Sequence, residues 1–213
     1  MNEFRQNLYD EWRESYQDDP AKAVGWRNQE ALDARFQCTL DHLAHKDFNS
    51  ISILDVGCGA SLNLLRYLPK SDFTYVGIDC NHNSLVYASE KWGIPYNEEV
   101  DLSSKMQLIK DEYLEKVRDW YGFDVIISQG IYQEFNRVRD VRDHIYRLST
   151  LLAPGGELLI MTPCNRVLDA EGKSVLKLSA YDAVGCLEDT GLPYELSLGE
   201  LGEHLIMRCW RND

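Results

Sequence analysis

The sequence has no long apolar run and no cluster of cysteines. No stretch approaches the roughly 20 apolar residues that a membrane-spanning helix needs, so we expect no membrane partner. The six cysteines form no C-x-x-C pair, and His42 and His45 lack an evident third ligand, so we expect no metal site. Residues 1–30 mix charged and apolar side chains, which argues against a signal peptide. These absences predict a cytoplasmic protein whose cysteines are reduced thiols.

Positive charge is also scarce. The chain has 22 Lys and Arg against 35 Asp and Glu, a formal net charge of −13, and it contains no run of Lys or Arg. Proteins that bind nucleic acid through its phosphates usually present a basic patch or stripe. We therefore do not expect nucleic acid as a partner, although a count over the whole chain leaves room for a local basic patch.

A strand followed by a glycine turn and a helix is the most informative pattern that is present. The apolar run Ile51–Val56 is typical of a central strand in a parallel sheet. Gly57 and Gly59 lack a Cβ, so the backbone can turn tightly there and approach a ligand. Ser61 is placed to cap a helix that begins near Leu62. In open α/β sheets, ligands bind at the carboxyl ends of strands, where this turn would lie.

The next strand ends in an acidic residue at an informative distance. The run Phe73–Ile78 precedes Asp79, which lies 79 − 59 = 20 positions after Gly59. An ionised carboxylate at this spacing reaches both hydroxyls of a ribose, which predicts an adenosine-type ligand. The third glycine of a pyrophosphate-binding turn would fall at Leu62, and no Gly-Lys-Ser/Thr follows, so a dinucleotide or P-loop site is disfavoured.

Four segments in the same order resemble the motifs of class I S-adenosylmethionine-dependent methyltransferases. They are Leu54–Gly59, Tyr75–Asp79, Phe123–Gly130 and Leu151–Ile160. Ser61 departs from the pattern, because the family often has a third glycine there. The resemblance covers residues 51–162 and implies an enzyme that transfers a methyl group from S-adenosylmethionine to a small molecule or, alternatively, to a protein side chain. A non-catalytic cofactor-binding accessory protein and an NAD-dependent oxidoreductase are the competing interpretations.

The expected fold is α/β, with a doubly wound, mainly parallel, seven-stranded Rossmann-like sheet that ends in a C-terminal antiparallel hairpin. Residues 1–50 are expected to form an N-terminal helical lid or leader and residues 51–213 the core, one domain overall. Helical spacing predicts helices over residues 83–92, 103–121, 136–153 and 179–190. Two β-rich runs around Gly199 and Gly202, residues 192–198 and 204–210, predict the hairpin.

The resemblance also implies which residues bind the cofactor. In the glycine turn they are Asp55, Gly57, Cys58 and Gly59; after the second strand Asp79 holds the ribose and Cys80 packs against adenine. Asp101 and Leu102 would contact the adenine amino group and face, with Glu98 and Glu99 as competitors for the acidic position. Gln129 would contribute from the loop after the fourth strand. Tyr9 and Trp26 would fold over the cofactor from the leader, although these aromatic side chains could instead bury the outer face of the sheet.

The catalytic residues are not identified by the sequence, because methyl transfer needs a general base only when the acceptor must lose a proton. Glu134 is a candidate base or a partner for a cationic acceptor, and Tyr132 is a candidate for orienting the acceptor. Cys164 follows a proline, as a nucleophile does in cytosine methyltransferases, but it lies after the wrong strand and is expected to be inert. His144 is expected to lie on the surface of a helix.

Overall fold

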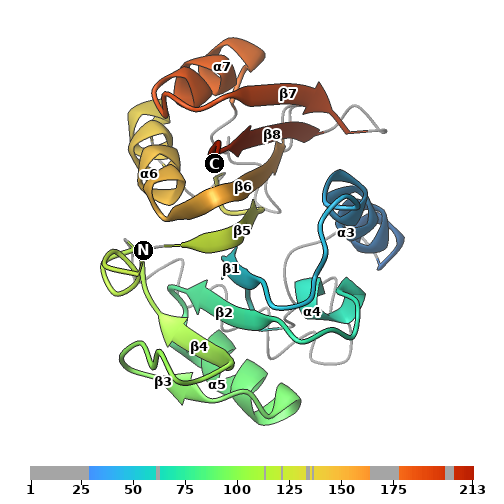
Figure 1. Ribbon diagram of the computed structural model, residues 1–213, viewed down its shortest axis with the longest axis vertical. Coiled ribbons are helices and arrows are strands. Elements are labelled where there is room, and N and C mark those ends of the chain that lie inside the picture. The colour runs from blue at the N-terminus through green and yellow to red at the C-terminus, as the bar shows by residue number, and fades with distance from the viewer. Residues whose placement is uncertain are drawn as a thin grey trace, which may run out of the picture. The chain divides into compact units, whose positions relative to one another are not determined.

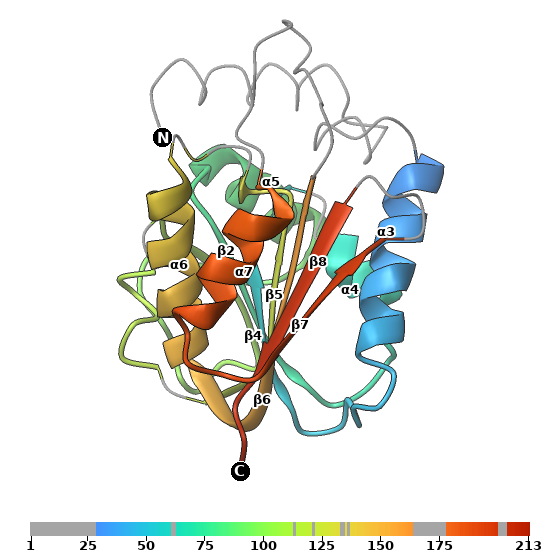
Figure 2. The ribbon, with the colours of Figure 1, turned by 90° about the horizontal axis from the view of Figure 1, so that it is seen from above.

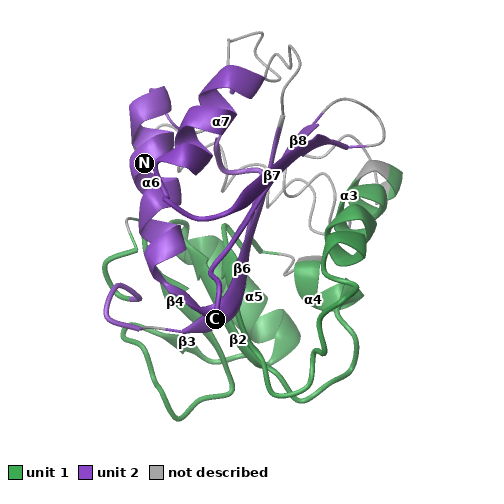
Figure 3. Ribbon diagram, turned by 45° about the horizontal axis from the view of Figure 1, so that its top comes forward, with its two compact units in different colours: residues 1–116 green, residues 117–213 purple. Residues whose placement is uncertain are grey.

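A computed structural model describes most of the chain. The described residues are 29–60, 63–112, 114–120, 122–132, 135, 137–163, 178–199 and 204–213. They form two compact units, residues 1–116 and residues 117–213, which Figure 3 shows in different colours. Each unit is one continuous segment of the chain. The expected lid of residues 1–50 and core of residues 51–213 stay a prediction.

The first unit is built on four parallel strands. Their order is β3-β4-β2-β1, with β1 at Ser52–Val56, β2 at Thr74–Asp79, β3 at Tyr96–Asn97 and β4 at Met106–Lys110 (Figure 1). In the register, Val56 lies opposite Ile78, and Asp79 lies opposite Lys110. The last four residues of β1 and the middle four of β2 are buried, as expected for strands in the interior of a parallel sheet.

Three helices accompany these strands: α3 at Gln29–His42, α4 at Asn63–Tyr67 and α5 at His82–Trp92. The start of α5 is fixed by Asn81, whose side chain accepts a hydrogen bond from the Ser84 N–H, and its end by Gly93 in the left-handed region, with φ 67°. Leu85 and Ala88 are the buried face of this helix, which packs on β2, β3 and β4. The predicted helix over residues 83–92 is therefore confirmed.

The second unit holds the other four strands. Their order is β5-β6-β8-β7, with β5 at Phe123–Gln129, β6 at Leu152–Pro163, β7 at Tyr194–Leu198 and β8 at His204–Trp210. Strands β5 and β6 are parallel, whereas β8 runs antiparallel to both β6 and β7. The predicted C-terminal hairpin is confirmed. The fold class is confirmed as well. The sheet has one strand more than the expected seven, because residues 106–110, which were predicted as part of a helix, form β4.

Two helices, α6 at Val138–Thr150 and α7 at Ala180–Glu188, lie side by side in the second unit (Figures 1 and 2). The start of α7 is a capping box, in which Ser179 and Asp182 each accept a hydrogen bond from the other's backbone N–H. Val141, Ile145 and Leu148 are fully buried at spacings of four and three, which is the apolar face that the sequence predicts. Among the described residues, no helix is both long and apolar enough to cross a membrane.

One predicted element is wrong. Residues 103–121 were expected to form a helix, but residues 106–110 form β4, which pairs with β2 over its whole length. Gln107, Leu108 and Ile109 are fully buried in this strand. The helical spacing of Met106, Ile109 and Tyr113 was misleading, because a short run of apolar residues is compatible with either a buried strand or a segment of helix.

Candidate cofactor site

The glycine turn after β1 has the backbone conformation that its sequence demands. Gly57 and Gly59 have φ angles of 78° and 64°, in the left-handed region that side chains with a Cβ disfavour. The N–H groups of Gly57 and Cys58 both donate to the Ile78 carbonyl, at 2.8 and 3.1 Å. The turn is therefore joined to the end of β2, beside Asp79.

Asp79 links the two strand ends through its carboxylate. Its Oδ2 accepts the Gly59 N–H at 3.0 Å, and its Oδ1 accepts the Asn81 N–H at 2.8 Å. Burial raises the pKa of this carboxyl, and the bonds from Asn81 and Gly59 act in the opposite direction. Cys80 also acts on this carboxyl through its thiol and its backbone N–H, both of which lower the pKa. A carboxylate is acceptor-only when ionised, which is the chemistry that the hydroxyls of a ribose need. The chemistry of this edge fits the adenosine part of S-adenosylmethionine.

Asp55 lies beneath the turn and is buried. The Tyr75 hydroxyl donates a hydrogen bond to its Oδ2 at 2.8 Å, and both side chains are in the interior of the unit. Burial raises the pKa of Asp55 to about 7; the Tyr75 hydrogen bond opposes the rise and the charge of Asp79 adds to it. Asp55 therefore supports the turn from within, and its predicted contact with the cofactor stays a prediction.

The two cysteines near the turn are packing groups. Cys58 is buried, and burial raises the pKa of its thiol well above the ordinary value. Cys80 is half-buried, and burial together with the charges of Asp79 and Glu112 raises its thiol pKa to about 12. A Cβ built on Gly77 would lie 3.0 Å from the Cys58 sulfur and 2.8 Å from the Leu108 Cδ2, so a larger residue does not fit there. Both thiols are neutral at pH 7 and poor nucleophiles.

Asp101 and Leu102 do not lie at the edge that carries the turn. They precede β4, and the backbone N–H and carbonyl of Asp101 bond to the two amide atoms of Gln107, at 2.9 and 2.7 Å. Gln107 pairs with Val76, three positions before Asp79. The Asp101 carboxylate accepts bonds from the N–H and hydroxyl of Ser103, which lower its pKa. The structure does not bring this pair to Asp79.

The structure places Asp111 and Glu112 at that edge, and the sequence interpretation missed them. Asp111 follows β4 directly, and its N–H donates to the Asp79 carbonyl at 3.1 Å. Its carboxylate accepts the N–H groups of Glu115 and Lys116, at 3.2 and 2.9 Å. The charge of Glu112 acts on Cys80. If residues 106–110 had been predicted as a strand, Asp111 would have been expected beside Asp79. Parallel strands end at the same edge of a sheet, and Asp111 directly follows this strand.

In the second unit, the loop after β5 begins with a tight turn. Gly130 has a φ of 71°, and its N–H donates to the Met161 carbonyl at 3.2 Å. Gln129, the last residue of β5, is half-buried. Tyr132 is fully buried, and burial raises the pKa of its hydroxyl. Tyr132 therefore does not present its hydroxyl to solvent in this structure, and its predicted role in orienting the acceptor stays a prediction.

Several other predicted residues fall outside the described part of the chain or differ from expectation. Glu134, Tyr9, Trp26 and Cys164 lie outside the described residues. His144 was expected on the surface, but it is only 8% exposed, because it lies on the same face of α6 as the buried Val141 and Leu148. No group of residues that could hold a metal ion occurs within the described ranges.

A family model described as a methyltransferase domain matches residues 27–200, most of the chain. The chain belongs to this methyltransferase family. Membership confirms the predicted class I S-adenosylmethionine-dependent methyltransferase and its cofactor, S-adenosylmethionine. It supports neither the oxidoreductase nor the accessory-protein interpretation.

Solved structures of other methyltransferases share the fold. A methyltransferase of Leishmania major described as SAM-dependent has a TM-score of 0.67 and 16% identity, over 95% of this chain and 82% of that one. Magnesium protoporphyrin IX methyltransferase of Synechocystis, solved with bound SAM, has a TM-score of 0.64 and 16% identity, over 98% and 93%. At such identities the likeness establishes the fold of this methyltransferase.

Curated relatives correct one prediction. The tRNA U34 carboxymethyltransferase of Aliivibrio salmonicida is 30% identical over 151 residues, 71% of this chain and 41% of that protein. The enzyme of the same name from Hydrogenovibrio crunogenus is 29% identical over 157 residues, 74% and 43%. The methyltransferase thus spans about two-fifths of the length of these relatives. Their names overturn the expectation that nucleic acid is not a partner.

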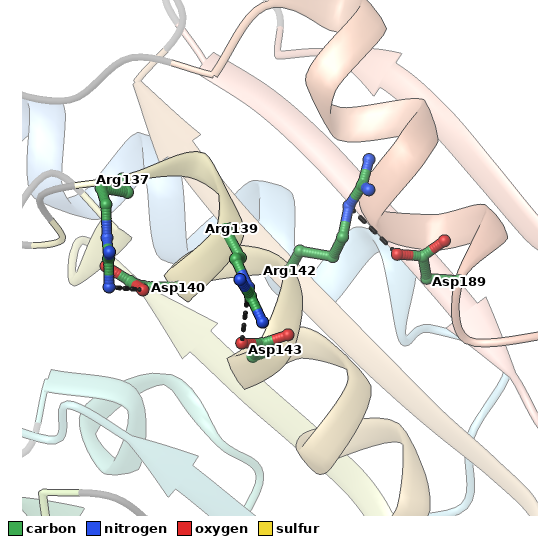
Figure 4. Close-up of polar contacts among 6 residues, drawn as sticks. All are labelled: Arg137, Arg139, Asp140, Arg142, Asp143 and Asp189. Carbon is green, nitrogen blue, oxygen red and sulfur yellow. Dashed lines mark hydrogen bonds and ion pairs between the residues drawn. The ribbon is translucent and has the colours of Figure 1, made fainter.

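That expectation failed because net charge is a sum over the whole chain. The arginine that precedes α6 and two arginines within the helix form ion pairs with acidic side chains (Figure 4). Arg137 pairs with Asp140 at 2.8 Å, Arg139 with Asp143 at 3.9 Å, and Arg142 with Asp189 at 3.1 Å. Net charge does not show where on the chain the charged side chains lie.

Proposed function

We propose that this methyltransferase modifies a base of tRNA at the position that its relatives act on, using S-adenosylmethionine or a derivative of it as donor. The observation that carries the proposal is the 30% identity, over 151 residues, with an enzyme named for tRNA U34. The match spans most of this chain but less than half of that enzyme, so the acceptor belongs to the proposal and not to the family assignment.

The residues of the first unit have a clear role in this function. When bound, the cofactor supplies a methyl group on a positively charged sulfur, which is the reactive group of the reaction. The Asp79 carboxylate, which the N–H groups of Gly59 and Asn81 hold in place, accepts the ribose hydroxyls. The positive φ angles of Gly57 and Gly59 let the backbone approach the ligand. Fixing the donor in one orientation toward the acceptor contributes much of the acceleration in such displacements.

A small-molecule acceptor is the second candidate, because this methyltransferase spans only about two-fifths of the length of the tRNA-modifying relatives that it matches. The two candidates differ in how the rate depends on salt. Binding of tRNA through phosphate contacts weakens steeply as salt rises, whereas a small neutral acceptor is hardly affected.

The test uses S-adenosylmethionine with an isotope-labelled methyl group and a pool of unmodified tRNA. After incubation the tRNA is digested and its nucleosides are analysed by mass spectrometry. We expect label in the nucleoside at position 34, at the mass of an added methyl group. Transfer of a carboxymethyl group is tested in a parallel reaction that contains a carboxylated derivative of S-adenosylmethionine as the donor. A tRNA carrying cytidine at that position and the variant Asp79→Ala are the controls, and both should lose the label. Label that appears in a small metabolite and never in tRNA would contradict the proposal.

A further inference from the structure

Gly77 leaves a space within the sheet of the first unit, on the face that carries Asp55. It lies on β2 between its register partners, Asp55 of β1 and Leu108 of β4, and directly paired residues of parallel strands share a face. A Cβ built on Gly77 would lie 3.1 Å from the Tyr75 Cε1 and 3.0 Å from the Cys58 sulfur. The Tyr75 ring and the Cys58 side chain therefore occupy the space that a larger residue would fill.

This space allows the Tyr75 hydroxyl to reach Asp55. Tyr75 lies two positions before Gly77 on β2, so both residues are on the same face, and its own register partner is Ile53. Its ring extends diagonally past Gly77, and the hydroxyl donates a hydrogen bond to the Asp55 Oδ2 at 2.8 Å. Both side chains are buried. The bond therefore links β2 to the residue that lies two positions before Gly57.

Packing alone does not explain why a carboxyl and a phenol occupy this place. Burying polar groups costs free energy, and an apolar pair of similar shape would fill the space without that cost. The Tyr75 bond opposes the rise in the pKa of Asp55 that burial causes, because it stabilises the ionised form. The charge of Asp79 adds to the rise, and the charge of Asp55 in turn raises the thiol pKa of Cys58. Tyr75 therefore affects both the orientation and the ionisation of Asp55.

The same two strands are also joined by the backbone of the glycine turn. The N–H groups of Gly57 and Cys58 donate to the Ile78 carbonyl, near the end of β2. The bond between Tyr75 and Asp55 crosses from β2 to β1 just before the turn begins. The turn is thus held by backbone bonds at its own residues and by one side-chain bond at the strand that leads into it.

We propose that Tyr75 is a positioning residue for the cofactor, which holds Asp55 in one orientation beneath the glycine turn and so preforms the turn for S-adenosylmethionine. Tyr75 acts through Asp55 and not on the cofactor, because its side chain is fully buried. Gly77 has a part in this arrangement, since a Cβ at that position would displace the Tyr75 ring. The inference concerns the methyl donor and does not depend on the proposed tRNA acceptor.

The test measures the Kd for S-adenosylmethionine by calorimetry at pH 5.5 and pH 8, in the full chain. Tyr75→Phe removes the hydroxyl and keeps the ring. The matched control, Tyr67→Phe, removes a hydroxyl at the end of α4 that donates to the carboxylate of Asp33 at the surface. At pH 8 we expect Tyr75→Phe to raise the Kd on the order of 10-fold, because a hydrogen bond to an ionised carboxylate is stronger than one to a neutral acid. At pH 5.5, where Asp55 is protonated, the rise should be smaller, and Tyr67→Phe should match the wild type at both pH values.

A second measurement needs neither cofactor nor turnover. The carboxyl-carbon NMR signal of Asp55 reports its pKa in the folded protein, and this pKa should be higher in Tyr75→Phe than in the wild type, because the bond that favours the ionised form is lost. Tyr67→Phe should leave it unchanged. An unshifted pKa of Asp55 in Tyr75→Phe, or an unchanged Kd at both pH values, would overturn the inference.

A second pair of variants covers the case in which Tyr75→Phe does not fold. Asp55→Asn keeps an acceptor for the Tyr75 hydroxyl but does not titrate, and it is compared with the double variant that also carries Tyr75→Phe. The double variant should bind the cofactor more weakly than Asp55→Asn, by the same factor at both pH values. Equal affinities of these two proteins would overturn the inference as well. None of these measurements uses an acceptor, so a failure of the proposed function leaves their outcome unaffected.

Discussion

The turn after β1 and the turn after β5 are built in different ways. In the first, glycine N–H groups and a carboxylate bond to one another, with Asp79 accepting from Gly59 and Asn81. In the second, the Gly130 N–H donates to the Met161 carbonyl, and the rings of Tyr132 and Phe135 contact the His144 ring. The first turn therefore contains an ionisable group among its hydrogen bonds, whereas aromatic rings pack next to the second.

Burial affects the ionisable groups of the two regions in opposite directions. It raises the pKa of Asp55 to about 7 and lowers the pKa of His144 to about 4. In both cases the neutral form is favoured, as expected for groups removed from water. The two groups therefore contribute pH dependences of opposite sign to the free energy of unfolding.

The largest expected effect is on the free energy of unfolding of the variant Asp55→Asn, which removes the pH dependence that Asp55 contributes. Between about pH 4 and pH 7 the folded protein keeps the Asp55 proton and the unfolded chain has lost it, so this group's contribution to stability falls as pH rises. Asp55→Asn keeps an acceptor for the Tyr75 hydroxyl but does not titrate. Urea unfolding from pH 4 to pH 8 measures the free energy of unfolding of both proteins. The stability of the variant relative to the wild type should increase with pH, by on the order of 3–4 kcal/mol. A constant difference between the two proteins would contradict the assignment.

The second prediction is the opposite slope from His144. Between pH 6.5 and about pH 4 the unfolded chain binds a proton at this residue and the folded protein does not, so stability is lost as pH falls. His144→Phe should remove this loss, on the order of 3 kcal/mol, and should therefore be less sensitive to acid than the wild type. The same unfolding series measures it. Parallel curves for the two proteins would show that His144 is not buried in its neutral form.

The third prediction concerns the bonded turn. Asp79→Ala removes the acceptor for Gly59 and Asn81 and the predicted ribose contact, so the Kd for S-adenosylmethionine should rise on the order of 100-fold. Asp79→Asn retains one side-chain oxygen and should fall between the two. Calorimetry measures all three proteins, with circular dichroism as a check on folding. A folded Asp79→Ala protein with normal affinity would remove Asp79 from the site.

The smallest effect distinguishes two acids of the first unit. Asp111→Ala removes the acceptor for Glu115 and Lys116 next to Asp79, which should weaken cofactor binding about five-fold, the equivalent of one lost capping interaction. Asp101→Ala disturbs its bonds to Ser103, away from that edge, and should leave the Kd nearly unchanged. The two variants serve as controls for each other. If Asp101→Ala weakened cofactor binding more than Asp111→Ala did, Asp101 would be the residue at the adenine site.

The sequence by itself determined the features that depend on neighbours along the chain. The two glycines between a buried strand and a helix require positive φ angles, and both have them. The spacing from Gly59 to Asp79 placed a carboxylate beside the turn, and the structure joins them at 3.0 Å. The C-terminal hairpin followed from two β-rich runs separated by glycines. These signals are local or nearly so, and each has a steric or hydrogen-bonding cause that does not need the rest of the fold.

Only the tertiary structure decided which residues join those features from a distance. Asp111 and not Asp101 reaches Asp79, because residues 106–110 pair with β2 as a strand. The sequence could not show this, since a short apolar run fits the helical and the strand period equally well. His144 is buried and not exposed, and the rings of Tyr132 and Phe135 pack against its imidazole. Whether a polar side chain on a helix is covered depends on which segment packs against it, and that is set by long-range contacts.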